Sequence, residues 1–313
     1  MITFLCSPKP FTGQNAINQL NALRSWRALD YGVEIIVFGN VPGAAEATEQ
    51  VQATHVPEIE CSNTGAPLFN GMVDYASRNA RHEVHVYVNC DILLTHSVVE
   101  GCLLARDAFS RFLLVGERLD LQPNVAVNVD NSTWYHHMLE LSSSGALTSR
   151  GPCAVDYFAF PRGLWTNLLP VYMGRARCDQ ALLHHCFRNA IPVIDGSRYI
   201  AAIHQYHDYS HVSGGKSEVY LGQDYALMSE LHGLRYSLLT IADAQWYLSA
   251  AGEVQVSRRA SLLRRLELSL RYKYQLPRIS LLARALQYWH GKQGVQPVPL
   301  GKNEIDLFLS HPA

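Results

Sequence analysis

Asp91 is the residue of this chain best placed to do chemistry. It follows Val84-His-Val-Tyr-Val88, whose β-branched and aromatic residues predict a buried strand. Open α/β sheets bind ligands at the carboxyl ends of their strands, and Asn89-Cys90-Asp91 stands at such an end. Two interpretations remain open. Asp91 either caps the turn that follows the strand, or is a metal ligand for a nucleotide diphosphate.

A histidine cluster further along the chain offers the other ligands that a metal site needs. His204, His207 and His211 lie close together in the sequence. Carboxylates and imidazoles hold divalent metals, which neutralise the charge that develops on a diphosphate leaving group. A hydrogen-bonded core loop would also explain the cluster. A zinc hydrolase is a third interpretation, although the segment lacks the glutamate of the helical metalloprotease motif.

The elements that must position these residues alternate between strands and helices. This alternation predicts an α/β fold, with a mostly parallel, Rossmann-like sheet flanked by helices. The expected strands are 2–6, 34–38, 84–88, 111–115, 154–160, 191–194 and 199–203, and the expected helices are 14–29, 44–52, 71–81, 98–106, 134–141 and 179–189.

Composition narrows the class of protein. The 26 basic and 27 acidic residues nearly cancel, so net charge does not point to nucleic acid. The seven cysteines are odd in number and unclustered, which indicates reduced thiols in a cytoplasmic protein. No apolar run approaches the roughly 20 residues that span a bilayer.

The chain changes character after residue 233, and we expect 234–313 to form a basic helical appendage. Residues 257–292 carry nine Lys or Arg and one acid, Glu267. Leucines at helical spacing predict two amphipathic helices, separated by Pro277. Such helices could bind the inner face of an anionic membrane. They could equally pack on the core or form a dimer element. No nucleic-acid-binding motif accompanies the basic residues.

Four segments together resemble nucleotide-sugar glycosyltransferases of the GT-A fold, of the kind that builds bacterial cell-surface polysaccharide. They are the first strand with its Pro8-Lys-Pro-Phe11 loop, the Val88-Asn-Cys-Asp91 strand end, the segment 174–183 and the His204–His211 block. The resemblance covers about residues 1 to 220, and we expect residues 1–233 to form the catalytic domain. It implies a nucleotide-diphosphate sugar donor, and a saccharide or lipid-linked acceptor.

The resemblance also implies residue roles in the donor site. Asn89-Cys90-Asp91 matches the D-x-D metal motif with Asn in place of the first Asp. Asp91 would then hold Mn or Mg together with His204 and His207. The residues expected to contact the nucleotide sugar are Ser7, Pro8, Lys9, Gly39, Asn40, Asp74, Asn89 and Lys216. For Asp74, an ordinary exposed helix carboxylate is the alternative interpretation.

Asp179 is the expected catalytic base, because inverting members of this fold use a carboxylate at a helix start to deprotonate the acceptor. The helix dipole would keep it ionised, although a simple N-cap explains the position equally well. The rival functions are a sugar-phosphate nucleotidyltransferase, whose Gly-rich loop is missing here, and a degenerate sugar-nucleotide-binding module. The residues expected to contact the acceptor are Arg118, Asp120, Asp156 and Arg175.

Overall fold

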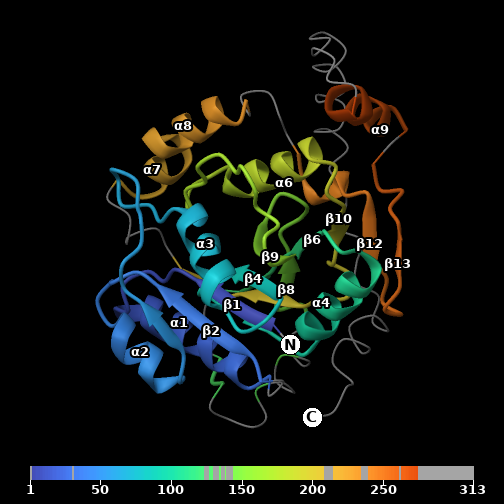
Figure 1. The fold of residues 1–313 in the computed structure, drawn as a ribbon. Helices are drawn as coiled ribbons and strands as arrows, with labels where there is room; N and C mark the ends of the chain where they lie inside the picture. Colours follow the sequence, from blue (N-terminus) through green and yellow to red (C-terminus); the bar gives the residue numbers. More distant parts are fainter. Residues whose placement is uncertain are drawn as a thin grey trace.

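The computed structural model describes residues 2–29, 32–122, 127–129, 134, 138, 144–207, 214–233, 239–260 and 262–273. The strands of its main sheet are β1 (Ile2–Cys6), β2 (Glu34–Phe38), β3 (Thr54–Val56), β4 (Val84–Val88), β6 (Leu113–Glu117), β9 (Val155–Pro161), β10 (Val193–Asp195), β12 (Trp246–Leu248) and β13 (Val254–Val256). Their order across the sheet is β13-β12-β10-β6-β9-β4-β1-β2-β3 (Figure 1). Only β9 and β13 oppose the other described strands of this sheet, so the predicted mostly parallel α/β sheet is confirmed.

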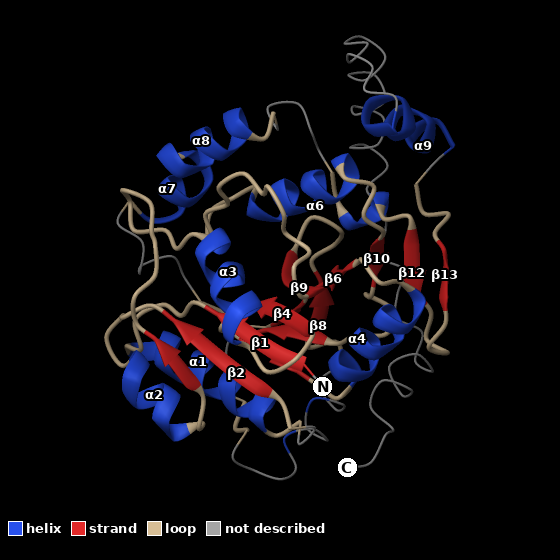
Figure 2. Ribbon diagram, in the orientation of Figure 1, coloured by secondary structure: helices blue, strands red, loops and turns tan. Residues whose placement is uncertain are grey.

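Helices cover both faces of this sheet (Figure 2). On one face lie α1 (Gly13–Arg27), α2 (Ala44–Gln50) and α4 (Ser97–Ala108), and on the other lie α3 (Phe69–Asn79) and α6 (Cys178–Arg188). Strand β4 shows why both faces are apolar. Val84, Val86 and Val88 join the core under α1 and α4, whereas Tyr87 joins the core under α3 and α6. The alternation along the strand therefore serves two cores at once.

A second sheet of four short strands stands at the carboxyl end of β4. It contains β5 (Ile92–Leu94), β7 (Leu119–Leu121), β8 (Leu147–Ser149) and β11 (Ala202–His204), in the order β5-β11-β7-β8. A separate small core that includes Leu93, Leu121 and Ile203 supports it. This sheet brings residues near position 90 against residues near position 204.

The chain after residue 214 adds short elements around the main sheet. Two strands, β12 and β13, fall in the range expected to be a helical appendage, and β12 pairs with β10 in the main sheet. The expected helix 134–141 lies almost entirely outside the described residues. The remaining helices are α7 (Gly215–Leu221), α8 (Gln223–Leu231), the 3-10 turn η2 (Ile241–Asp243), α9 (Leu262–Leu268) and the π-helical turn η3 (Ser269–Lys273).

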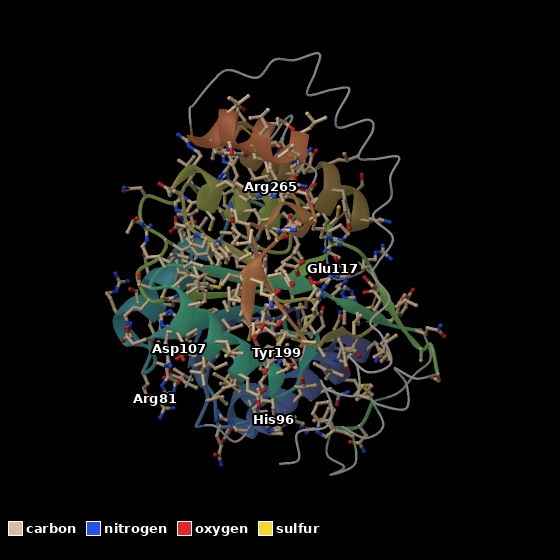
Figure 3. All side chains as sticks on the ribbon, turned by 90° about the vertical axis from the view of Figure 1, so that its right-hand side faces the viewer. Arg81, His96, Asp107, Glu117, Tyr199 and Arg265 are labelled. Carbon is tan, nitrogen blue, oxygen red and sulfur yellow. The ribbon has the colours of Figure 1, made fainter. Side chains whose placement is uncertain are left out.

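Helix α9 lies at one end of the molecule. Figure 3 shows Arg265 on α9, at the opposite end of the molecule from His96, which precedes α4. The buried Arg264 of α9 makes an ion pair with Asp243 in η2, and its Nε lies 2.8 Å from Asp243 Oδ1. This pair ties α9 to the part of the chain that carries β12.

Candidate metal and diphosphate site

Strand pairing brings Asp91 and His204 together. Asp91 lies in the turn between β4 and β5, and His204 is the last residue of β11. Because β11 runs antiparallel to β5, His204 is paired with Ile92, the residue after Asp91. The backbone N–H of Gln205 then donates to the Asp91 carbonyl at 3.2 Å. The juxtaposition is therefore built by the backbone.

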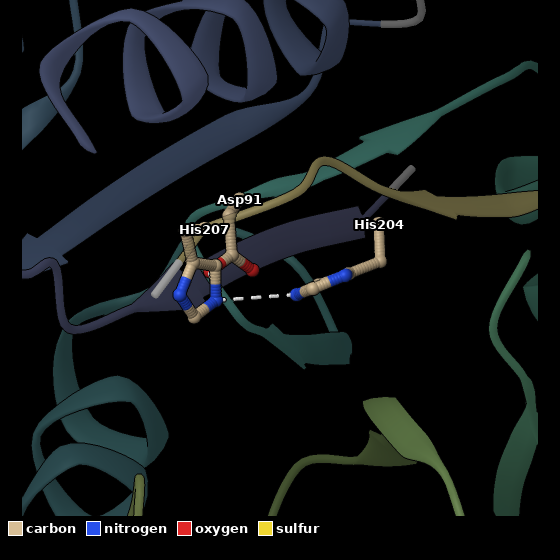
Figure 4. A group of neighbouring side chains, drawn as sticks. All are labelled: Asp91, His204 and His207. Atoms are coloured by element: carbon tan, nitrogen blue, oxygen red, sulfur yellow. Dashed lines mark hydrogen bonds and ion pairs between the residues drawn. The ribbon is translucent and has the colours of Figure 1, made fainter. Parts of the chain in front are cut away.

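The side chains of Asp91, His204 and His207 converge on one point (Figure 4). His207 Nε2 lies 3.1 Å from Asp91 Oδ2 and 3.2 Å from His204 Nε2. One ligand atom from each of the three residues falls within 4.8 Å of the other two. Asp208 and His211, which belong to the same sequence cluster, lie outside the described residues.

Asp120 orients His204 from the other side. Strand β7 runs parallel to β11 with Asp120 beside His204, and His204 Nδ1 lies 3.3 Å from Asp120 Oδ1. The negative charge of Asp120 attracts a proton to Nδ1 even without hydrogen-bond geometry, so this contact favours the tautomer whose Nε2 is unprotonated. Burial raises the pKa of Asp120, but His204 and Arg118 outweigh it and hold that pKa below its ordinary value.

Arg118 continues the polar network towards β9. Its guanidinium lies 2.8 Å from both Asp120 and Asp156, and Asn89 donates its amide to Asp156. Burial disfavours the charge, but the neighbouring carboxylates raise the pKa of Arg118 above its ordinary value. Three residues expected to contact the acceptor are thus engaged with one another. Asn89 faces Asp156 and stands outside the cluster of metal-ligand atoms.

Asp91 has the properties of an ionised ligand. It is 4% exposed, and burial alone would raise its pKa, but Lys9 and the two histidines hold that pKa well below the ordinary value. Its Oδ1 atom is buried and accepts no hydrogen bond from the described part of the chain. A buried, unsatisfied carboxylate oxygen is costly. One carboxylate and two imidazoles together can hold a divalent transition metal such as Mn, with diphosphate oxygens in its remaining positions.

Lys9 lies in this site. Its ammonium is 2.6 Å from Asp91 Oδ2 and 2.8 Å from His207 Nε2. Lys9 reaches this point because the loop after β1 lies beside the carboxyl end of β4, which is the neighbouring parallel strand. The contact with the nucleotide sugar that the resemblance implies for Lys9 stays a prediction.

Buried amides of α1 hold the loops of the site in place. Gln19, which is 1% exposed, accepts from the Lys9 backbone N–H at 2.6 Å and donates to the Lys9 carbonyl at 2.9 Å. Asn18 donates to the Tyr206 carbonyl at 2.9 Å. Ile17 of the same helix is 54% exposed. Sequence patterns missed these amides because they score as solvent-facing.

Asp179 lies in the first turn of α6, one residue after the helix begins. Arg177 occupies the N-cap position, so Asp179 is not the cap. Burial and the charge of Asp156 raise the pKa of Asp179 to about 6, although two backbone N–H groups at the helix start oppose the shift. Burial therefore outweighs the backbone N–H groups of the helix start in setting this pKa. A carboxyl group with this pKa is mostly ionised at pH 7 and is a better base than an ordinary aspartate.

The other expected nucleotide residues fall in two places. Ser7 and Pro8 follow β1, and Gly39 and Asn40 follow β2, so these residues line the same edge of the sheet because the two strands are parallel. Asp74 is exposed on α3. Their contacts with a nucleotide stay predictions.

Arg175 and Lys216 are engaged elsewhere. Arg175 is 8% exposed, and its Nε lies 3.3 Å from Asp224 of α8. The expected acceptor contact of Arg175 stays a prediction. Lys216 is exposed on α7, with its ammonium 5.8 Å from the centre of the Tyr220 ring.

Comparison with known proteins assigns the fold. The sequence matches no protein-family model and no curated protein sequence. Among solved structures, S. aureus TarS 1-349 in complex with UDP-GlcNAc aligns over 99% of this chain and 84% of its own, at 11% identity and a TM-score of 0.50. The chain therefore has the GT-A fold, as predicted.

Other alignments are weaker. The mannosyltransferase PcManGT from Pyrobaculum calidifontis, in complex with GDP-Man and Mn²⁺, aligns over 98% of this chain and 85% of its own, at 13% identity and a TM-score of 0.44. In the complex of TarS 1-349 with UDP, the match spans only 41% of this chain and 38% of that one, at 13% identity and a TM-score of 0.31.

Proposed function

We propose that the protein is a glycosyltransferase that moves a sugar from a nucleotide-diphosphate donor to a saccharide or lipid-linked acceptor. One observation carries the proposal. Asp91 and two histidines more than a hundred residues away meet at the carboxyl edge of a GT-A sheet, with Asp91 Oδ2 beside His207 and Asp91 Oδ1 left without a partner among the described residues. A GT-A neighbour in complex with UDP-GlcNAc supports a nucleotide sugar as the donor.

Mn or Mg is the proposed cofactor, held by Asp91, His204 and His207. When bound, the ion neutralises the negative charge that develops on the departing diphosphate. Asp120 keeps His204 in the ligating tautomer. The residues after β1 and β2 form the remaining wall of the donor site, where Ser7, Pro8, Gly39 and Asn40 would contact the nucleoside.

Asp179 is the proposed general base, and the reaction is proposed to invert the anomeric centre. Its carboxylate takes the proton of the acceptor hydroxyl as the oxygen attacks the anomeric carbon opposite the diphosphate. The raised pKa of Asp179, to which the charge of Asp156 contributes, supports this role. Asp156 in turn accepts a hydrogen bond from Asn89 in the turn that carries Asp91.

A peripheral contact with an anionic membrane is proposed for the region 257–292. Leu262, Leu263 and Leu266 of α9 are 79%, 57% and 54% exposed, whereas Arg264 turns inward. Exposed leucines beside the exposed Arg265 form a surface that suits an anionic lipid headgroup layer. Within the part of the chain that the structure describes, no helix is long and apolar enough to cross a bilayer. A cytoplasmic location at the inner face of the membrane would fit this contact.

Donor hydrolysis tests the function. The purified chain is incubated with UDP-GlcNAc, UDP-glucose and GDP-mannose, each with and without Mn²⁺, and released UDP or GDP is measured. We expect slow, Mn²⁺-dependent release from one donor, and at least a hundredfold loss in Asp91→Ala, because one metal ligand and its charge are removed.

Three other results would contradict this proposal. Donor binding without turnover by any acceptor mixture would favour a sugar-nucleotide-binding module. Release of pyrophosphate from a sugar phosphate and UTP would favour a nucleotidyltransferase. A tightly bound stoichiometric zinc in the purified protein would favour a zinc hydrolase.

A further inference from the structure

Lys9 occupies the space in which a metal would meet Asp91 and His207. Its ammonium lies 2.6 Å from Asp91 Oδ2 and 2.8 Å from His207 Nε2, and those two atoms are 3.1 Å apart. The three atoms form a closed triangle. The backbone of Lys9 is fixed on both sides by Gln19, so the side chain is delivered to this point by a rigid support.

A divalent ion and this ammonium exclude one another for two reasons. First, an imidazole nitrogen has one lone pair, so His207 Nε2 either accepts a hydrogen bond from Lys9 or ligates a metal. Second, the two positive charges would stand a few ångströms apart in a buried site, where like charges repel strongly. Asp91 Oδ1, in contrast, remains available to an ion.

The Lys9 ammonium has an alternative position, beside the donor diphosphate. The Lys9 side chain is 23% exposed, whereas the Asp91 side chain is 6% exposed, so part of the lysine side chain already contacts solvent. A lysine ammonium sits on a flexible four-carbon stem and binds phosphate as a point charge. A diphosphate held at Asp91 and the histidines would bring its oxygens within reach of a lysine anchored at the end of β1.

We propose that Lys9 is an exchangeable resident cation, which gives up its place at Asp91 and His207 to the divalent metal and then binds the donor diphosphate. The inference rests on the proposed function, because it assumes a metal and a diphosphate at this site. It adds the order of binding, in which the metal displaces the Lys9 ammonium before that ammonium binds the diphosphate. The site keeps its charge balanced before the metal arrives, and metal and nucleotide bind cooperatively, because the diphosphate gives the displaced ammonium a new partner.

Binding of Mn²⁺ alone tests the exchange. The affinity of the full chain for Mn²⁺ is measured by electron paramagnetic resonance, without nucleotide, for the unchanged protein, Lys9→Met and Arg106→Met. Arg106 is a matched control, because it loses one positive charge at an exposed position beside Asp107. We expect Lys9→Met to bind Mn²⁺ about ten- to a hundredfold more tightly, since a charge-assisted hydrogen bond no longer competes, and Arg106→Met to bind normally. A merely structural role for Lys9 would weaken binding instead.

The second measurement follows the nucleotide. With saturating Mn²⁺, the affinity for UDP and for GDP is measured by calorimetry on the same three proteins. We expect the nucleotide that binds the unchanged protein to bind Lys9→Met about tenfold more weakly, because one phosphate contact is missing. One substitution therefore changes metal and nucleotide affinity in opposite directions.

Several outcomes overturn the exchange. Equal or weaker Mn²⁺ binding by Lys9→Met refutes it while leaving the proposed glycosyltransferase intact. Full UDP or GDP binding without Mn²⁺, lost in Lys9→Met, shows that Lys9 replaces the metal and does not exchange with it. Absence of Mn²⁺ and nucleotide binding from all three proteins removes the proposed function as well.

Discussion

Replacing Asp179 with asparagine should stabilise the protein while removing most of its activity. The physical basis is the cost of a partly buried charge at the start of α6. The pKa of Asp179 is raised from 3.8 to about 6, first by burial and then by the charge of Asp156. A carboxyl group whose pKa is higher in the folded state stabilises the fold when it is protonated, and that stability is lost as the pH rises.

The magnitude follows from the two pKa values. Each pH unit between 3.8 and about 6 corresponds to about 1.4 kcal/mol, which gives an upper limit of about 3 kcal/mol. Asp179 is only partly buried, so water screens the charge and we expect about 1 to 2 kcal/mol. Asparagine has no charge to bury. Its advantage should be small near pH 4, grow as the pH approaches 6, and stay constant above that.

Urea unfolding of Asp179→Asn and the unchanged protein, followed between pH 4.5 and 8, measures this difference. Asp107→Asn is the control, because the Asp107 side chain is 67% exposed and should show no such trend. A variant that is less stable than the unchanged protein at pH 7.5, or a difference that does not vary with pH, would refute the reasoning.

The same variant tests the catalytic role. If Asp179 is the base, transfer should fall by about 10²- to 10⁴-fold while Mn²⁺ and nucleotide still bind. In the unchanged protein, transfer should decline as the pH drops through about 6, because the carboxylate is then protonated. Unchanged activity in the asparagine variant would remove the proposed role and leave the donor site untouched.

Two further predictions concern the support of the metal site and the outer helix. Asp120→Asn should weaken Mn²⁺ binding about 10- to 100-fold, because His204 loses the carboxylate that favours its ligating tautomer. Electron paramagnetic resonance measures the Mn²⁺ affinity. An affinity equal to that of Asp107→Asn would contradict this prediction. The double change Leu262→Gln with Leu266→Gln should weaken co-sedimentation with phosphatidylglycerol vesicles about tenfold or more, since two exposed leucines would no longer enter the lipid interface. Equal sedimentation would show that α9 is not the contact.

Long strands and helices were predictable from the sequence because their patterns are local. The expected strand 34–38 coincides with β2, and the expected helix 179–189 with α6 to within one residue. The three-residue strands of the second sheet are too short to show a period. Strands β12 and β13 were missed for the same reason. The reversal of β9 within the sheet has no local signal either, since a buried strand reads alike in both directions.

The sequence by itself determined which chemical groups the protein has and where its strands end, and so pointed to Asp91 and the histidines as candidate ligands. Only the tertiary structure decided who their neighbours are. It set Lys9 against Asp91 and His207, and it turned Asp120 towards His204. The reason is that type and periodicity belong to a stretch of chain, whereas these contacts depend on the pairing of short strands far apart in sequence. The pKa of Asp179 likewise depends on its burial in the fold, which cannot be predicted from its position at the start of a helix.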